Sequence, residues 1–162
     1  MRRSIAAGNW KMNGLRENFN EILLIDAASE NVNCDVILCV PDTLIREISE
    51  KTKNIFSGGQ NCHIEASGAF TGDISAEMIK DAGASHVIVG HSERRVNYNE
   101  SNNLIKSKAQ TALNEGLKAI ICIGETLKER ETGITLNIIK KQLLESLPQE
   151  ITGETIIIAY EP

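Results

Sequence analysis

The amino-acid sequence predicts an α/β fold built on a parallel β-sheet, and two patterns carry that prediction. Short, continuous apolar runs rich in β-branched residues recur along the chain, and unbroken hydrophobicity indicates strands that are buried on both faces. The segments between these runs have helical periodicity, so strands and helices alternate. Consecutive parallel strands are then joined by right-handed crossovers. Periodicity alone fits both an open sheet and a closed barrel.

Six segments are expected to be strands. In chain order they are Ser4–Ala7, Val36–Val40, Ile55–Ser57, His86–Val89, Ala119–Ile123 and Ile156–Ala159, the third giving the weakest signal. With the helical segments between them they form about five βα units followed by a sixth strand. No change in composition and no linker rich in proline or serine divides the chain, so residues 1–162 are expected to form a single domain.

Three of the helical segments carry an apolar stripe at the spacing of one helix face. The stripes consist of Phe19, Ile22, Leu23 and Ala27; of Ile105, Ala109 and Ala112; and of Leu136, Ile139, Leu143 and Leu147. Thr126 and Glu129 have the spacing of a capping box with Thr126 as the N-cap, so a helix is expected to start just after Gly124. The charged run 128–131 is expected to be a solvated helix surface.

Composition and charge exclude several classes of protein. The 162 residues are 41% hydrophobic and 24% charged, which is typical of a globular domain. The net charge of −5 argues against nucleic acid or an anionic membrane as a partner. No apolar run approaches the ~18 residues of a membrane span. Met1–Ser4 precedes an apolar stretch too short for a signal peptide, so we expect a cytoplasmic protein.

The four cysteines indicate neither a zinc site nor a disulfide framework. None of them forms a C-x-x-C pair, whereas zinc ligands come in closely spaced pairs. Cys39 and Cys122 lie inside apolar runs, where a thiol behaves as a small buried hydrophobe. We therefore expect reduced thiols, in keeping with a cytoplasmic location.

Four polar side chains follow the ends of three predicted strands, where parallel α/β folds gather their functional groups. Lys11 follows the first strand, His91 and Glu93 follow the fourth, and Glu161 follows the sixth. A carboxylate can remove a proton next to a carbonyl, an imidazole can donate to the developing enediolate oxygen, and a lysine can hold an anion. Each residue alone is commonly structural, but together on one rim they indicate acid–base catalysis.

Other chemistries fit the sequence less well. A Schiff-base aldolase needs a nucleophilic lysine on an inner strand, but Lys11 lies beyond Trp10 and the sixth strand offers a carboxylate instead. A metal-assisted enolase-type reaction needs several converging carboxylates, and only two can be placed. The phosphate-loop and dinucleotide-binding patterns G-x-x-x-x-G-K-[ST] and G-x-G-x-x-G are absent from the sequence.

Five sequence blocks resemble the triosephosphate isomerase family and occur in that family's order. They are Ala7–Asn13; Gly59–Cys62 together with Gly68–Gly72; Val87–Arg95; Cys122–Glu125; and Ala159–Pro162. The resemblance implies a TIM (β/α)8 barrel, cut here to about five βα units and a sixth strand. It also implies interconversion of dihydroxyacetone phosphate and D-glyceraldehyde 3-phosphate through an enediolate, as in glycolysis and gluconeogenesis, with no cofactor and no metal.

The resemblance assigns roles to the residues on the rim. Glu161 is the expected base and His91 the neutral electrophile, while Lys11 binds the phosphate and polarises the carbonyl region, with Asn9 on the oxygen side. Glu93 is expected to support Lys11, although a salt bridge to one of the two neighbouring arginines is the structural alternative. Ser92 begins a short helix next to His91 and belongs to the same supporting set.

The resemblance also implies a homodimer. The segment Gln60–Asp73 is similar to a loop that reaches into the partner subunit near Asn9 and Lys11. Its expected contact residues are Gln60, Asn61, Thr71, Gly72 and Asp73. Asp73 stands where glutamate is more common in the family, which alters one contact between subunits.

The family continues past Glu161-Pro162 into a mobile lid and two further βα units. At roughly 30 residues a unit, eight units need about 240 residues. The sequence is therefore expected to supply about two thirds of a barrel, with open strand edges that favour association. Two hypotheses follow: the chain is the greater part of a working isomerase, or it is catalytically silent and only associates with itself or with a complementing segment.

Overall fold

The computed structural model describes residues 4–162 and contains one parallel sheet of six strands. In sheet order, which is also chain order, the strands are β1 (Ile5–Asn9), β2 (Asp35–Cys39), β3 (Ile55–Gly59), β4 (His86–Val89), β5 (Lys118–Ile123) and β6 (Ile156–Tyr160). All six expected strands are confirmed, with ends that differ by at most two residues. Met1, Arg2 and Arg3, on which the expectation about a signal peptide partly rests, lie outside the described residues.

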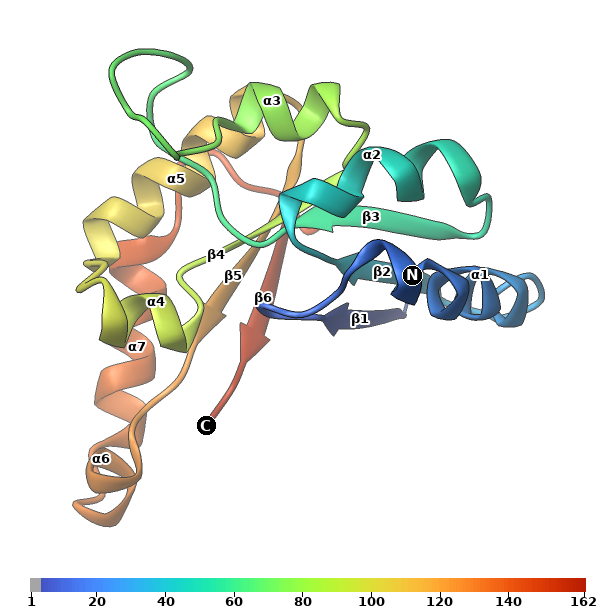
Figure 1. Cartoon of the computed structure of the whole chain (residues 1–162). Helices are drawn as coiled ribbons and strands as arrows, with labels where there is room; N and C mark the ends of the chain where they lie inside the picture. The colour runs from blue at the N-terminus through green and yellow to red at the C-terminus, as the bar shows by residue number, and fades with distance from the viewer. Residues whose placement is uncertain (1–3) are drawn as a thin grey trace.

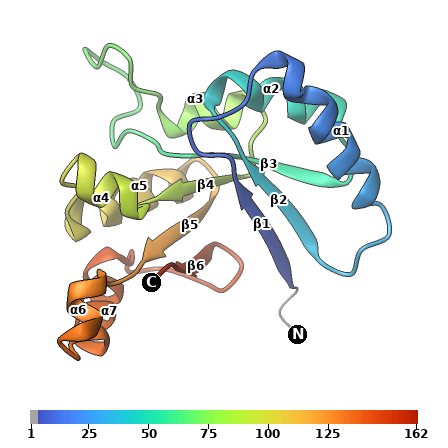
Figure 2. The same cartoon turned by 60° about the horizontal axis from the view of Figure 1, so that its bottom comes forward.

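Eight helical segments connect the strands of the described chain. They are η1 (Arg16–Asn18), α1 (Phe19–Ala28), α2 (Asp42–Lys51), α3 (Ala76–Asp81), α4 (Ser92–Asn97), α5 (Asn102–Asn114), α6 (Leu127–Glu131) and α7 (Thr135–Ser146). The sheet curls, with the helices on its convex side and β1 and β6 as its two outer strands (Figures 1 and 2). An unbroken strand order with helices on one side is the arrangement of a barrel wall, whereas an open doubly wound sheet reverses its order.

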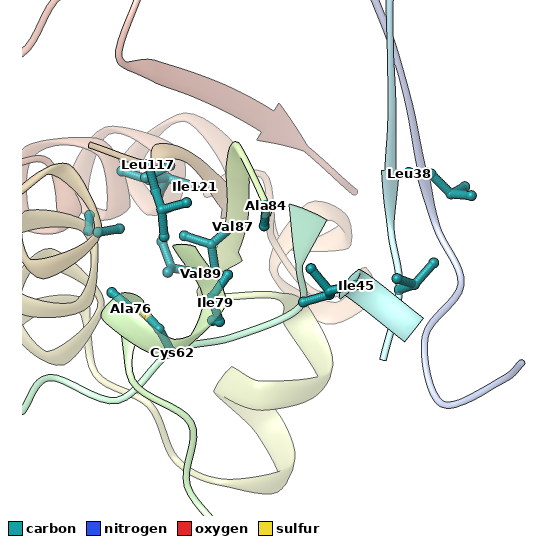
Figure 3. Packing of buried hydrophobic residues seen from close by; sticks show 14 of the residues in the cluster. Leu38, Ile45, Cys62, Ala76, Ile79, Ala84, Val87, Val89, Leu117 and Ile121 are labelled. Atoms are coloured by element: carbon teal, nitrogen blue, oxygen red, sulfur yellow. The ribbon is translucent and has the colours of Figure 1, made fainter. Parts of the chain in front are cut away.

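The convex face of the sheet carries the main hydrophobic core. Alternate residues of the strands, such as Val87 and Val89 of β4, point outward and pack against Ile45 and Ile79 of the helices (Figure 3). Ile105, Ala109 and Ala112 of α5 are fully buried in the same cluster, as their spacing predicts. These contacts fix the strands relative to the helices and therefore fix the positions of the strand ends.

The concave face carries a second, smaller apolar cluster. Its buried members are Ile37, Cys39, Ile88, Ile120 and Cys122, with Ile157 and Ala159 of β6 packed against them. Because strand residues alternate between the two faces, one set of side chains builds the outer core and the next lines the interior. The expectation that Cys39 and Cys122 are buried is confirmed, and all four cysteines are free thiols.

The apolar stripe expected for the first helix is only partly correct. Phe19 and Ile22 are buried, but Leu23 is 39% exposed and Ala27 is exposed. The helix α1 lies at the β1 end of the sheet and is anchored on one side only, where Asp26 accepts hydrogen bonds from the backbone of Lys53 and Asn54. Its opposite side has no neighbouring element among residues 4–162.

The stripe expected for the last helix is correct except at its beginning. Ile139, Leu143 and Leu147 pack against the main core, whereas Leu136 is 83% exposed. Leu136 lies in the first turn of α7, which projects past the sheet together with α6 (Figure 1). The helical spacing was therefore right, but the packing partner ends before the helix does.

Candidate functional site

The first strand delivers Asn9 and Lys11 to the carboxyl end of the sheet in an unusual backbone conformation. Lys11 has a φ of 54°, in the left-handed region that residues with a side chain seldom adopt. The Oδ1 atom of Asn9 accepts a hydrogen bond from the backbone N–H of Lys11 at 2.9 Å. Backbone strain of this kind persists where the surroundings hold it, and it clusters at functional sites.

Gln60 is part of what holds this turn. Its Nε2 atom donates to the backbone oxygen of Lys11 at 2.8 Å, to Oδ1 of Asn9 at 3.2 Å and to the backbone oxygen of Cys39 at 3.3 Å. Gln60 thus joins the ends of β1, β2 and β3 and supports Asn9 and Lys11. Its expected contact with a partner subunit stays a prediction.

Lys11 and Glu93 form an ion pair above the strand ends, with 2.9 Å between Nζ and Oε1. The hydrogen bond from Lys11 holds the pKa of the Glu93 carboxyl below its usual value, and the same bond raises the pKa of Lys11. The pairing is the one expected from the sequence, since Arg94 binds Glu100 and Arg95 binds other groups. Both charges are therefore kept at neutral pH.

His91 lies between the two acidic residues and is 7% exposed. The backbone N–H of Glu93, at the start of α4, donates to Nδ1 of His91 at 3.2 Å. A ring nitrogen that accepts a hydrogen bond carries a lone pair, so the proton of the neutral imidazole is on Nε2. Nε2 lies 3.4 Å from Oε2 of Glu161, and the ring lines a cavity on the concave face together with Glu161.

Glu161 reaches the site from the end of β6. Its backbone N–H donates to the carbonyl oxygen of Ile123 at 2.9 Å, which continues the pairing of β5 with β6. Its carboxylate accepts a hydrogen bond from the hydroxyl of Ser92 at 3.1 Å, so the two ends of the site are tied together. The carboxylate is about half exposed and opens to the concave side of the sheet.

The backbone of Glu161 packs directly against Gly124, which has no side chain to obstruct it. A side chain at position 124 would overlap the carbonyl oxygen of Glu161. The amide of Gln142 in α7 holds both polar groups of the Gly124 backbone, accepting from its N–H and donating to its oxygen, each at 2.9 Å. The sequence block around Gly124 is therefore a backbone support for Glu161.

Two cavities adjoin at His91. One, of about 610 Å³, is lined by Asn9, Lys11, Gln60, His91 and Glu93 together with neighbouring loop residues. That volume lies within the range of small-molecule sites. The other, of about 170 Å³, lies on the concave face and is lined by His91, Glu161 and apolar residues of the strands.

The remaining residues of the expected dimer loop are divided between two places. The Oδ1 atom of Asn61 accepts a hydrogen bond from Nζ of Lys108 at 2.7 Å, so it is held within its own chain. Thr71, Gly72 and Asp73 lie at the exposed tip of the loop. Gly72 adopts a φ of 96°, and a Cβ atom added there would have no atom within 4 Å apart from those of its chain neighbours.

Glu100, Lys108 and Arg94 form a partly buried charged cluster that was not predicted from the sequence. The Oε1 atom of Glu100, which is 6% exposed, lies 2.7 Å from Nζ of Lys108 and 2.6 Å from Nε of Arg94. Burial acts to raise the pKa of Glu100, but the hydrogen bonds from Lys108 and Arg94 outweigh it and leave that pKa below its usual value. Lys108 lies on the buried face of α5, and no local motif marks a lysine there as paired.

The charged run 128–131 was expected to be a solvated helix surface, and Lys128, Arg130 and Glu131 are exposed, but Arg130 also takes part in an ion pair. Arg130 turns back toward the site, with its Nη2 atom 2.8 Å from Oε1 of Glu125 and 2.9 Å from the hydroxyl of Tyr160. Tyr160 also donates to Glu125, whose side chain is fully buried and attracts the cation. The capping box of Thr126 and Glu129 is confirmed and sets the direction of α6.

The described chain contains no cluster of three or more metal-ligating side chains, counting histidine, cysteine, aspartate and glutamate. Within residues 4–162, every helix is too short or too polar to cross a membrane.

The chain is similar along its whole length to known proteins. The family model described as triosephosphate isomerase matches residues 4–162. Triosephosphate isomerase of Ruegeria sp. (strain TM1040) is 47% identical over 162 residues, which are 100% of this chain and 66% of that protein. That of Bradyrhizobium sp. (strain ORS 278) is 49% identical over 165 residues, covering 99% of this chain and 66% of its own length.

Solved structures agree with the sequence comparison. The crystal structure of triosephosphate isomerase from Bartonella henselae superimposes with a TM-score of 0.94 at 49% sequence identity. The match covers 100% of this chain and 68% of that one. The chain thus spans slightly less than two thirds of the length of the Ruegeria and Bradyrhizobium proteins.

Proposed function

We propose that this chain, which belongs to the triosephosphate isomerase family, supplies the catalytic groups that interconvert dihydroxyacetone phosphate and D-glyceraldehyde 3-phosphate. The observation that carries the proposal is the 3.4 Å distance between Nε2 of His91 and Oε2 of Glu161. A base and a hydrogen-bond donor at this separation can act on the carbon and the oxygen of one carbonyl substrate.

The residues divide the work of proton transfer. Glu161 removes a proton from the carbon beside the carbonyl, and the electron pair moves to the carbonyl oxygen. His91 donates a hydrogen bond from Nε2 to that oxygen while its negative charge develops. Glu161 then returns the proton to the neighbouring carbon, as the hydroxyl proton passes between the two oxygens, so neither atoms nor electrons are gained or lost.

Lys11 and Asn9 are proposed to bind the substrate. The ammonium of Lys11 faces the large cavity, where it can attract the phosphate dianion and the carbonyl region. Its partner Glu93 keeps it charged and oriented, and Ser92 holds the carboxylate of Glu161 until substrate takes its place. General acid–base catalysis of this kind contributes about 10²–10⁴-fold to the rate. The reaction uses no metal and no cofactor in this scheme.

We further propose a homodimer in which the tip of the loop, at Thr71–Asp73, enters the large cavity of the partner. The tip is exposed, and the cavity beside Lys11 and Met12 is open, with Met12 96% exposed. Sedimentation equilibrium tests this: a monomer at micromolar concentration would contradict it. The four free thiols support a cytoplasmic, reducing location.

A coupled isomerase assay tests the proposed activity. Residues 1–162 alone are expected to give no turnover, because the side chain of Glu161 is half exposed and water can therefore reach the carboxylate. Mixed with a polypeptide that supplies the remaining third of the Bartonella henselae relative, the chain is expected to turn over substrate. Full activity of the Glu161→Gln variant in that mixture would contradict the role of Glu161.

The alternative hypothesis, that the chain is catalytically silent, predicts a different result in the same assay. If the chain only associates with itself or with a complementing segment, the mixture forms a complex but gives no turnover. Size-exclusion chromatography with light scattering, run on the assayed samples, separates a failure to associate from a failure to catalyse. Association without turnover would reject the proposed activity.

A further inference from the structure

One guanidinium joins four structural elements behind the site. The Nε atom of Arg95 donates to the carbonyl oxygen of Gly90 at 2.9 Å, and Nη2 donates to that of Cys122 at 3.0 Å. Nη1 donates to Oδ1 of Asn102 at 2.6 Å, and Nη2 lies 3.4 Å from the hydroxyl of Ser146. The side chain thus connects the ends of β4 and β5 with the start of α5 and the end of α7.

The acceptors of Arg95 are neutral, although its side chain is partly buried. Among residues 4–162, no carboxylate lies within ion-pair distance of its guanidinium. Burial lowers the pKa of Arg95, because its charge gains no full ion pair in return for lost solvation. What arginine supplies here is a rigid fork of donors with fixed directions.

The first bond of this fork acts on His91. Gly90 has a φ of 69°, and a side chain there would overlap Ile105, so the chain turns sharply at this glycine. The carbonyl of Gly90 belongs to the same peptide plane as the N–H of His91. By holding that carbonyl, Arg95 fixes the plane from which the imidazole projects.

The second bond acts on Glu161. Cys122 pairs in register with Ala159, and the next carbonyl along β5, that of Ile123, accepts the backbone N–H of Glu161. Arg95 holds the Cys122 carbonyl on the side of β5 that faces β4. The end of β5, whose Ile123 carbonyl accepts the backbone N–H of Glu161, is thereby fastened to the turn that carries His91.

We propose that Arg95 is a positioning residue that sets His91 relative to Glu161, an inference that rests on the proposed function for its catalytic meaning. The residue touches neither side chain. It acts through the carbonyls of Gly90 and Cys122. Gly90 directly precedes His91, and Cys122 directly precedes Ile123, whose carbonyl accepts the backbone N–H of Glu161. A lysine at this position has a single ammonium group and cannot reproduce the fork.

The test measures how much the side chain of Glu161 changes the ring 15N resonances of His91 in the 162-residue chain. The ring 15N resonances of His91 are recorded at one fixed pH with and without Glu161→Gln. This change in resonance is the coupling, and it is measured again in Arg95→Met and in Arg95→Lys. Arg46→Lys is the matched control, because Arg46 pairs with Asp81 on the exposed surface.

The expected result is a coupling that falls by more than roughly half in Arg95→Met and by less in Arg95→Lys, but stays unchanged in Arg46→Lys. A coupling of native size in Arg95→Met would overturn the inference, even if the variant melts earlier, since a merely structural role lowers stability alone. If Arg95→Met does not fold, Arg95→Lys decides by the same readout. A wild-type chain without any coupling would also overturn it.

This readout needs no turnover, so it separates the inference from the proposed function. Coupling that depends on Arg95 in a chain whose complemented form never turns over substrate would reject the function and keep the inference. Turnover in the complemented form, together with a coupling that does not change when Arg95 is replaced, would keep the proposed function and reject the inference.

Discussion

The Nε2 atom of His91 lies 3.4 Å from Oε2 of Glu161, although the strands that these residues follow are separated by β5. The curl of the sheet makes this contact possible, because it turns the ends of β4 and β6 toward the same concave space (Figure 2). The hydroxyl of Ser92 then bridges to the same carboxylate oxygen. This geometry fits the proposed roles, in which Glu161 is the base and His91 the donor toward a single small substrate.

Shortening the side chain of Glu161 should lower kcat, because the carboxylate must reach the substrate carbon. Glu161→Asp withdraws the carboxylate by about one bond length, and misplacement of this size should lower kcat about 10²-fold in the complemented enzyme. Glu154→Asp makes the same chemical change at an exposed loop position and should leave kcat unchanged. Steady-state assays of both variants test this, and a loss below about tenfold for Glu161→Asp would contradict it.

His86 should make stability depend on pH. Burial lowers the pKa of this histidine from 6.5 to about 4, with Lys118 adding to the effect and Asp35 opposing it. The folded state therefore favours the neutral ring, so the contribution is fully present above pH 6.5 and is lost as the pH falls toward 4. The loss amounts to roughly 3 kcal/mol.

Urea unfolding at several pH values measures this effect. His86→Gln should unfold with a weaker pH dependence between pH 7 and 4 than the parent chain, because the buried ring whose pKa is lowered by folding is then absent. His63→Gln removes a histidine from the exposed loop and serves as the control. Identical slopes for the parent and for His86→Gln would rule out His86 as the cause.

The four thiols should differ sharply in reactivity. Burial raises the pKa of Cys39 to about 12 and those of Cys62 and Cys122 to about 11, whereas Cys34 is partly exposed. Because the thiolate is the nucleophile, alkylation at neutral pH should label Cys34 first. Mass spectrometry of the labelled peptides, with urea-unfolded chain as the control, gives the order, and early labelling of Cys122 would contradict the described burial.

Removing the partner of a buried carboxylate should destabilise the chain strongly. Lys108→Met leaves Glu100 with Arg94 as its one remaining cation, and the cost should be about 3 kcal/mol in the free energy of unfolding. Lys106→Met, two residues away at a partly exposed position of α5, should cost less than about 0.5 kcal/mol. Equal midpoints of urea unfolding for the two variants would show that the buried pair contributes nothing.

The strand pattern could be predicted from the sequence because continuous apolar runs report burial on both faces. All six runs, from Ser4–Ala7 to Ile156–Ala159, became strands within two residues of their expected ends. The exposed side chains of Leu23 and Leu136 could not be foreseen, since periodicity shows which residues share a face but not where the packing neighbour ends.

The residues on the rim were predicted from their place after strands, whereas the residues that hold them were not. Arg95 and Gln142 act on backbone carbonyls and amides that come together only after folding, and no local spacing announces such contacts. Arg130 lies in a run that is charged throughout, so nothing distinguishes it from its solvated neighbours until Glu125 is buried beside it.

Isotope exchange with solvent tests the central claim most directly. The complemented enzyme is incubated with dihydroxyacetone phosphate in deuterium oxide, and the product is examined by proton NMR. The account predicts deuterium on carbon in at least part of the product, because a proton held on Glu161 can exchange with solvent, and it predicts loss of this exchange in Glu161→Gln. Product formed without any deuterium, or exchange that persists unchanged in Glu161→Gln, would contradict the account.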